Sequence, residues 1–395
     1  MTLPRKDLFE IPEGMVYLDG NSLGVLPKGA AARAVQTIEE EWGVKLIRAW
    51  NEAGWMALPQ KVGDRIAGLI GAPAGSVATG DTLSIKVYQA VAAAIQMRPE
   101  RRVILSDTGN FPTDLYMAAG LIRTIGKDYE LRTVAPEDVA GAITEDVAAV
   151  MLTQVDYRSG RVHDMDALTK LAHDKGAVMI WDLAHSAGAV PVDLTGSNAE
   201  FAVGCTYKYL NGGPGAPAFI YARPDIIDAV DPALSGWLGH EAPFAMEPTY
   251  RPAMQTERLR VGTPSVVQLA ILDRALDVWD GVNMQDVRAA SIKLSELFIT
   301  EVERRCPTLE LASPRDATQR GSQVSFGFEH GYPAVQALAD LGVIGDFRAP
   351  NIMRFGFTPL YLDEADILRA AEILEKVITD ELWRDPKYNV RSRVT

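Results

Sequence analysis

Continuous apolar runs separated by helical stretches recur through the middle of the sequence and constrain the fold more than any other feature. The runs at 103–105, 147–155 and 177–180 are typical of strands buried on both faces, and residues 165–175 have helical spacing. This alternation predicts an α/β fold with a mostly parallel sheet between two layers of helices. Residues 216–221 follow a glycine-rich loop too closely for a helical crossover, so we expect that strand to run antiparallel.

Two polar residues follow such runs. Asp182 ends the run that begins at Ala177, and Lys208 lies in the glycine-rich loop 206–215 after the apolar run 201–204. Ligands of open α/β sheets bind outside the carboxyl ends of the strands. A lysine amine can form a Schiff base, and a carboxylate can keep a pyridine nitrogen protonated, which together are the needs of pyridoxal phosphate (PLP) chemistry. Alone, Lys208 would be interpreted as a solvated lysine, but its placement with Asp182 favours the cofactor.

Composition excludes several classes of protein. The net charge of −13 argues against binding to nucleic acid or to anionic membranes. The two cysteines, Cys205 and Cys306, make no disulfide framework and suit a reducing compartment. The histidines lack metal-ligand spacing, so we expect no metal site. No apolar run reaches the length of a membrane span, and residues 1–7 lack a signal-peptide core, so we expect a cytoplasmic protein.

The C-terminal third of the chain has a different pattern. Long helices are predicted at 264–279, with Thr263 as N-cap, and at 284–303. Short strands at 323–328 and 352–357 then alternate with helices, which predicts a smaller α+β domain. We therefore divide the chain into an N-terminal segment that packs with the small domain, a large cofactor-binding domain and a small C-terminal domain, at 1–50, 51–282 and 283–395.

A phosphate site is predicted where residues 80–84 (GDTLS) precede the helical stretch 85–97. Free backbone N–H groups and hydroxyls at a helix start bind anions without needing net positive charge. We assign the phosphate to Thr82, Leu83 (through its backbone) and Ser84. The same residues are typical N-caps, and both interpretations can hold at once.

Six motifs in one order make the chain similar to the kynureninase family, in its bacterial form. They are 17–24 (YLDGNSLG), 110–114 (NFPTD), 182–188 (DLAHSAG), 205–211 (CTYKYLN), 235–240 (SGWLGH) and 348–354 (RAPNIMR). The resemblance covers nearly the whole chain, although 182–188 is shared with cysteine desulfurases. It implies a PLP-dependent hydrolase of the aspartate-aminotransferase type (fold type I), with a seven-stranded sheet and a homodimer whose active sites lie at the interface.

The resemblance also implies roles for single residues. Lys208 would carry the cofactor and take the substrate α-proton, Asp182 would hold the pyridine nitrogen, and Tyr207 would bond the phosphate and assist proton transfer. The remaining cofactor-binding residues would be Phe111, which stacks on the ring, Asp114, Thr153 and His185, with Trp237 and Thr263 from across the dimer interface. Each has an ordinary alternative, such as a core ring for Phe111, a first-turn helix aspartate for Asp114 or a core histidine for His185.

Arg354 is the residue expected to hold the substrate α-carboxylate, because a guanidinium forms two parallel bonds with a carboxylate. The alternative is a structural ion pair. Ser22, Trp55 and Arg48 are weaker candidates for the aromatic end of the substrate.

The implied reaction is hydrolysis of L-kynurenine to anthranilate and L-alanine, in tryptophan catabolism or NAD biosynthesis. Threonine at 263 suits unsubstituted kynurenine, but the choice between kynurenine and 3-hydroxykynurenine stays open, as does the group that activates water. Three alternatives remain. A cysteine desulfurase would need a thiol on a mobile loop, and the sequence around neither cysteine is typical of such a loop. An aminotransferase and a non-catalytic relative of the same fold are the others.

Overall fold

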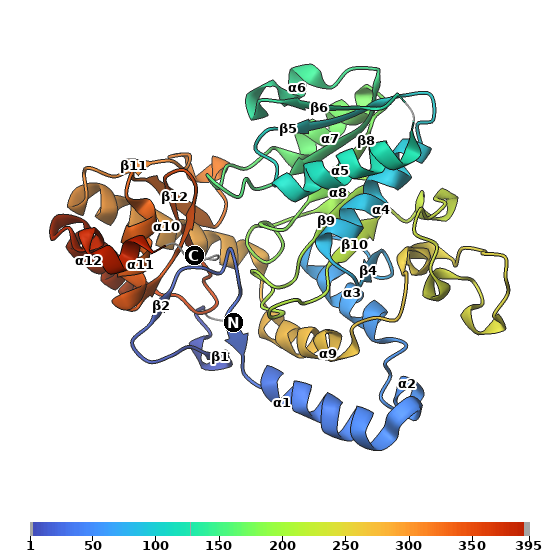
Figure 1. The fold of residues 1–395 in the computed structure, drawn as a ribbon, viewed down its shortest axis with the longest axis horizontal. Helices are drawn as coiled ribbons and strands as arrows, with labels where there is room; N and C mark the ends of the chain where they lie inside the picture. The colour runs from blue at the N-terminus through green and yellow to red at the C-terminus, as the bar shows by residue number, and fades with distance from the viewer. Residues whose placement is uncertain (1–2, 127, 391–395) are drawn as a thin grey trace.

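The computed structural model describes residues 3–126 and 128–390, and its larger part is built on one mostly parallel sheet (Figure 1). Strand β10 runs antiparallel to both of its neighbours, and the other paired strands of this sheet are parallel. The predicted mostly parallel sheet and its antiparallel strand are confirmed. The seven strands, in order across the sheet, are β4 (Val77–Thr79), β10 (Phe219–Ala222), β9 (Phe201–Gly204), β8 (Val178–Asp182), β7 (Val147–Thr153), β5 (Val103–Asp107) and β6 (Glu130–Val134).

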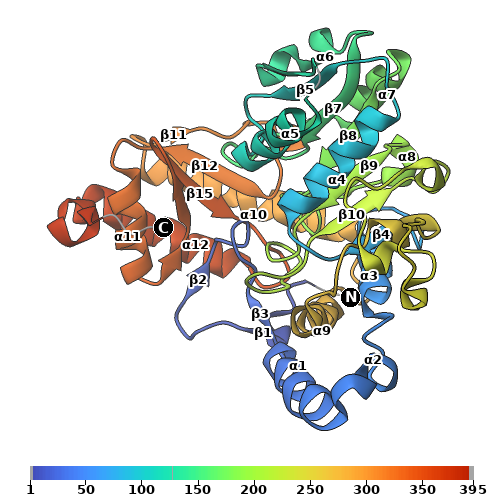
Figure 2. The same ribbon diagram turned by 45° about the vertical axis from the view of Figure 1, so that its right-hand side comes forward.

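Helices cover both faces of this sheet, as Figures 1 and 2 show. Strand β8 illustrates why, because its residues alternate between two apolar clusters: Ile180 packs into one and Trp181 into the other. The first cluster is covered by α4 (Leu83–Gln96) and α5 (Pro112–Ile125). The second is covered by α3 (Leu58–Leu69), α7 (Met165–Asp174) and α9 (Val266–Ala275).

The C-terminal part, orange to red in Figure 1, has an antiparallel sheet of its own. Its order is β11 (Glu310–Leu311), β12 (Gln323–Gly327), β15 (Ile352–Gly356) and β14 (Asp346–Arg348). Its helices are α10 (Met284–Arg305), α11 (Gly331–Asp340) and α12 (Glu364–Thr379). A reciprocal capping box between Asp363 and Asp366 begins α12.

The N-terminal residues contact both parts. Strand β2 (Val16–Tyr17) pairs in parallel with β13 (Val343–Ile344), and β1 (Phe9–Glu10) pairs with β3 (Leu26–Pro27). Helix α1 (Ala30–Gln36) instead packs on α9. After Gln36 this helix changes into a wider π-helical segment, Thr37–Lys45. At this point the Thr37 hydroxyl donates to the carbonyl of Arg33 (2.8 Å), a bond that disturbs regular helices.

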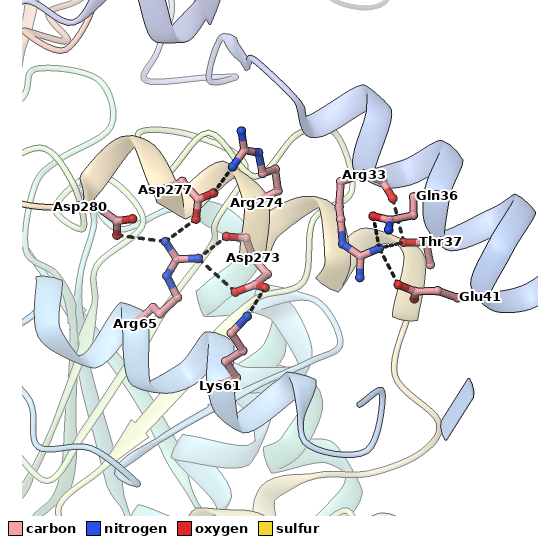
Figure 3. Close-up of polar contacts among 10 residues, drawn as sticks. All are labelled: Arg33, Gln36, Thr37, Glu41, Lys61, Arg65, Asp273, Arg274, Asp277 and Asp280. Carbon is pink, nitrogen blue, oxygen red and sulfur yellow. Dashed lines mark hydrogen bonds and ion pairs between the residues drawn. The ribbon is translucent and has the colours of Figure 1, made fainter. Parts of the chain in front are cut away.

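Ion pairs fasten α9 and the helical turn after it, Leu276–Trp279, to α3 (Figure 3). Arg65 on α3 bonds Asp273 at 3.0 Å and Asp277 at 2.8 Å, and Lys61 reaches Asp273 at 2.6 Å. The start of α9 differs from the prediction: the helix begins at Val266 after Ser265, so Thr263 is not its N-cap. Serine is as good a cap as threonine, and the sequence offered both.

Candidate active site

Lys208 and His185 meet where two neighbouring strands end. Lys208 follows β9 and His185 follows β8, and Lys208 Nζ lies 2.9 Å from His185 Nε2. Burial lowers the pKa of His185 well below its usual value, and the positive charges of Lys208, Arg354 and Arg348 lower it further. The imidazole is therefore neutral at physiological pH, and its Nε2 can accept a hydrogen bond from the Lys208 amine.

Asp182, the last residue of β8, is buried beside this pair. Its Oδ1 accepts a bond from the backbone N–H of Ala184 at 2.8 Å, and its Oδ2 lies 3.4 Å from Thr153 Oγ1. Burial raises the pKa of Asp182, while the charge of Lys208 opposes the rise. Asp114 is buried next to it, and burial and then the Asp182 charge raise the Asp114 pKa well above its usual value. Two such carboxyls do not both ionise readily without a cation or an N–H donor between them.

Aromatic rings border the lysine. Phe111, just before α5, is 40% exposed, an unusual degree for phenylalanine. Lys208 Nζ lies 6.0 Å from the Phe111 ring centroid and 5.8 Å from that of Tyr207. The Cys205 thiol and then burial raise the pKa of the Tyr207 hydroxyl, so it keeps its proton at neutral pH.

Thr82, Leu83 and Ser84 form the start of α4. Thr82 has an extended backbone, and its side chain does not cap the helix. The first N–H groups of α4 are thus available to an anion.

Arg354 and Ser22 lie together, as two of the residues expected to bind substrate. Arg354 is buried, and its Nε donates a hydrogen bond to the Asp346 carboxylate at 2.6 Å. Its Nη2 donates to the same carboxylate. Its Nη1 donates to the carbonyl of Tyr157 at 2.5 Å, and its Nη2 donates to Ser22 Oγ at 3.0 Å. Arg348 also pairs with Asp346, at 2.9 Å. The carboxylate already on the Arg354 guanidinium is thus that of the chain's own Asp346.

Four other expected site residues have their contacts elsewhere within one chain. Trp55 donates to Glu41 (2.7 Å) and packs edge-on to Trp50, and Arg48 pairs with Glu52. Trp237 is 40% exposed, and Thr263 is also exposed. Within residues 3–126 and 128–390, no group of three metal-ligating side chains gathers.

Sequence reasoning missed Asp346 and gave no role to Asn110. Asp346 stands directly opposite Arg354 on the neighbouring antiparallel strand. The sequence signal that could have revealed Asp346 was an acidic residue two positions before Arg348, in a stretch that forms a buried strand. Asn110 bonds both Thr153 and the Phe111 backbone, and its position next to Phe111 was the corresponding signal.

Solved structures similar to this one are PLP enzymes. The cysteine desulfurase of Thermococcus onnurineus NA1 has a TM-score of 0.81, covers 96% of this chain and 99% of its own, and is 17% identical. A C-DES mutant with glycine covalently linked to its PLP cofactor has a TM-score of 0.83, covers 94% and 99%, and is also 17% identical. The model of the DegT/DnrJ/EryC1/StrS aminotransferase family matches residues 87–203. The fold is that of fold type I PLP-dependent enzymes.

More similar sequences narrow the class. The model of the kynureninase C-terminal domain matches residues 287–374. The kynureninase of Pseudomonas fluorescens is 50% identical over 399 residues, which cover 99% of this chain and 96% of that protein. The kynureninase of Burkholderia pseudomallei (strain 1106a) is 49% identical with the same coverage. This chain belongs to the kynureninase family, and the predicted class of PLP-dependent hydrolase is confirmed.

Proposed function

We propose that this enzyme hydrolyses L-kynurenine to anthranilate and L-alanine, with PLP bound at Lys208. One observation carries the proposal: in a chain about half identical to kynureninases, the Lys208 amine lies beside a buried carboxylate and a half-exposed aromatic ring.

The residues present fit PLP. Asp114 Oδ2 is buried with no hydrogen-bond partner, and Asp182 Oδ2 has the distant Thr153 hydroxyl, with the Asp114 carboxyl beside Asp182. A pyridinium N–H would satisfy such a buried carboxylate pair. The exposed face of Phe111 can stack on the ring, and the start of α4 can bind the phosphate. When bound, PLP supplies an aldehyde that joins the substrate amine and a ring that withdraws electrons from its α-carbon.

The chain's own residues would then move protons and hold the substrate. The Lys208 amine, released by the incoming substrate, can take the α-proton, and the neutral His185 lies in contact with it. Tyr207, protonated at neutral pH, is our candidate for proton transfer to or from the leaving part of the substrate. Arg354 is our proposed partner of the α-carboxylate, which would have to share or replace Asp346 on the guanidinium.

Thiol chemistry is not supported as an alternative. Burial raises the pKa of Cys205, and burial also raises that of Cys306, to about 11. Both thiols therefore stay protonated and shielded from substrate, whereas a desulfurase needs an accessible thiolate.

We also propose a homodimer in which Trp237 and Thr263 reach the partner's cofactor. Trp55 and Arg48 stay weaker candidates for the aromatic end of the substrate. The support for the dimer is the helical segment Thr37–Lys45, which buries a charged side chain and exposes its apolar ones. Its Glu41 is buried and paired with Arg33 at 2.7 Å (Figure 3), while its apolar side chains face outward. Exposed apolar residues in and beside this segment, at 35–47, and in the connection between β10 and α9 include Val35, Ile38, Trp42, Val44, Leu46, Ile47, Phe244, Met246 and Met254.

The division into segments 1–50, 51–282 and 283–395 is likewise our proposal, supported by the two separate sheets. Both cysteines are free thiols, which supports a cytoplasmic location, and we place the reaction in tryptophan catabolism or NAD biosynthesis. Among the described residues, no helix has the length and apolarity that a bilayer span requires.

Incubation with L-kynurenine tests the function directly, because the product anthranilate is fluorescent. We expect the wild type to release it and Lys208→Ala to lose about 10³-fold or more of the rate, together with the yellow colour of bound PLP. Lys170→Ala, an exposed lysine paired with Asp174, is the control and should keep both. A Lys208→Ala protein that stays yellow and active would refute the assignment. The same assay with 3-hydroxykynurenine settles the preferred substrate.

A further inference from the structure

Asn110 is a buried amide between the two groups that would hold the PLP ring. Its Oδ1 accepts the backbone N–H of Phe111 at 2.7 Å and lies 2.5 Å from Thr153 Oγ1. Its Nδ2 donates to Ser106 Oγ at 3.0 Å. Thr153 in turn is the hydroxyl beside Asp182.

The direction of each of these bonds is fixed. A backbone N–H can only donate, so the Asn110 atom that faces Phe111 must be the oxygen. The Ser106 hydroxyl gives its hydrogen to the carbonyl of Met151 at 2.6 Å, and its lone pair therefore receives Asn110 Nδ2. The amide cannot turn over without breaking both contacts.

The Thr153 hydroxyl has one hydrogen and two possible acceptors. Asn110 Oδ1 is 2.5 Å away and Asp182 Oδ2 is 3.4 Å away, beyond the usual range of O–H···O bonds. The hydrogen therefore goes to Asn110, and Thr153 presents only lone pairs to Asp182. The other groups that bond Asp182 are the N–H of Ala184, on Oδ1, and the neighbouring Asp114 carboxyl. The Thr153 hydroxyl therefore leaves Oδ2 able to accept.

We propose that Asn110 is a positioning residue that withholds the Thr153 hydroxyl hydrogen from Asp182, so that Asp182 Oδ2 stays open for the ring N–H of PLP. The same oxygen holds the backbone of Phe111, so one amide aligns the stacking ring with the carboxylate. The inference rests on the proposed function, because it needs PLP at Lys208.

A double-mutant cycle tests it. PLP is titrated into cofactor-free wild type, Asn110→Ala, Thr153→Val and the double variant. In Asn110→Ala the freed hydroxyl can turn to Asp182 and compete with the ring nitrogen, so we expect about tenfold weaker PLP binding. Adding Thr153→Val removes the competing donor, and the double variant should regain most of that loss. NMR of PLP isotope-labelled at the ring nitrogen should show less protonation in Asn110→Ala alone.

The outcomes separate the possibilities. A double variant that binds as weakly as Asn110→Ala would overturn the inference, because Asn110 would then only support its loop. If Asn110→Ala does not fold, Thr153→Val alone decides: a loss of about tenfold or more means that the hydroxyl donates to Asp182, against our inference, and a smaller loss supports it. A wild type that binds no PLP would instead refute the proposed function.

Discussion

At the scale of single residues, two buried carboxyls near Arg354 differ in their ionisation. Asp19 is buried near Asp346, and burial and then the Asp346 charge raise its pKa to about 7. Burial alone would raise the pKa of Asp346 too, but its bonds with Arg354 and the charge of Arg348 lower it. One carboxyl of the pair is therefore an anion, while the other titrates near neutrality.

Asp19→Asn should stabilise the enzyme more at pH 8 than at pH 5. The unfolded carboxyl titrates near 3.8 and the folded one near 7. Between these values the native state keeps a proton that the unfolded state has lost, so rising pH favours unfolding until about pH 7. Asparagine does not titrate, so the variant does not lose this stability as the pH rises. We expect the difference in free energy of unfolding between Asp19→Asn and the wild type to grow by about 2 kcal/mol between pH 5 and pH 8. Urea unfolding measures it, with exposed Asp7→Asn as control. An advantage independent of pH would contradict the assigned pKa.

Site residues differ in how far sequence could reveal them. Lys208 and Asp182 each follow an apolar run, so their place at the edge of the sheet is a local property. Asn110 and Thr153 contact each other from 43 positions apart, and Asp346 matters because strand pairing sets it opposite Arg354. No local pattern encodes such contacts, so the Asn110–Thr153 hydrogen bond and the Asp346–Arg354 ion pair are visible only in the structure.

At the scale of elements, the apolar pattern of the sequence predicted the strands of the large sheet well and the ends of the helices less well. Runs at 103–105, 147–155 and 177–180 became β5, β7 and β8 because both faces of each strand are buried. Helix ends were harder to predict. Neither the wide turn after Gln36 nor the cap at Ser265 follows from periodicity, since both depend on how a few polar groups near the helix end are satisfied.

The loop after β2 has no room for added volume at Gly24. Gly24 donates its N–H to the carbonyl of Tyr207 at 2.7 Å, and a Cβ there would lie 2.3 Å from the Lys208 carbonyl oxygen. Gly24→Ala should therefore displace the Lys208 loop, cost about 1–3 kcal/mol and weaken PLP binding. Gly68→Ala on α3 is the matched control, because nothing lies within 4 Å of its added Cβ. Thermal unfolding and PLP titration compare them, and equal behaviour would mean that the loop yields freely.

At the scale of the whole molecule, the outward apolar face of residues 35–47 is the clearest sign of an assembly. Figure 1 shows this blue segment at the periphery, away from both sheets. Trp42 is 60% exposed and Ile47 is 77% exposed. A monomer would leave this face in water at a cost in hydrophobic free energy.

Trp42→Glu combined with Ile47→Glu should turn the proposed dimer into a monomer. Two carboxylates buried in an apolar interface would be desolvated without partners. Light scattering after size exclusion measures the mass, and Leu368→Glu, an exposed leucine on α12, is the control. PLP binding should weaken in the monomer because Trp237 and Thr263 would lose their partner. A double variant that keeps the wild-type mass would exclude this face as the interface.

The pairing of β2 with β13 has a consequence for synthesis of the chain. Val16 leaves the ribosome long before its partner Val343 is translated. Until then β2 has an open edge, and Ser22 has no Asp346 to bond. A premature stop codon shortly before residue 343 would therefore abolish activity, even though Lys208, His185 and Asp182 had all been translated.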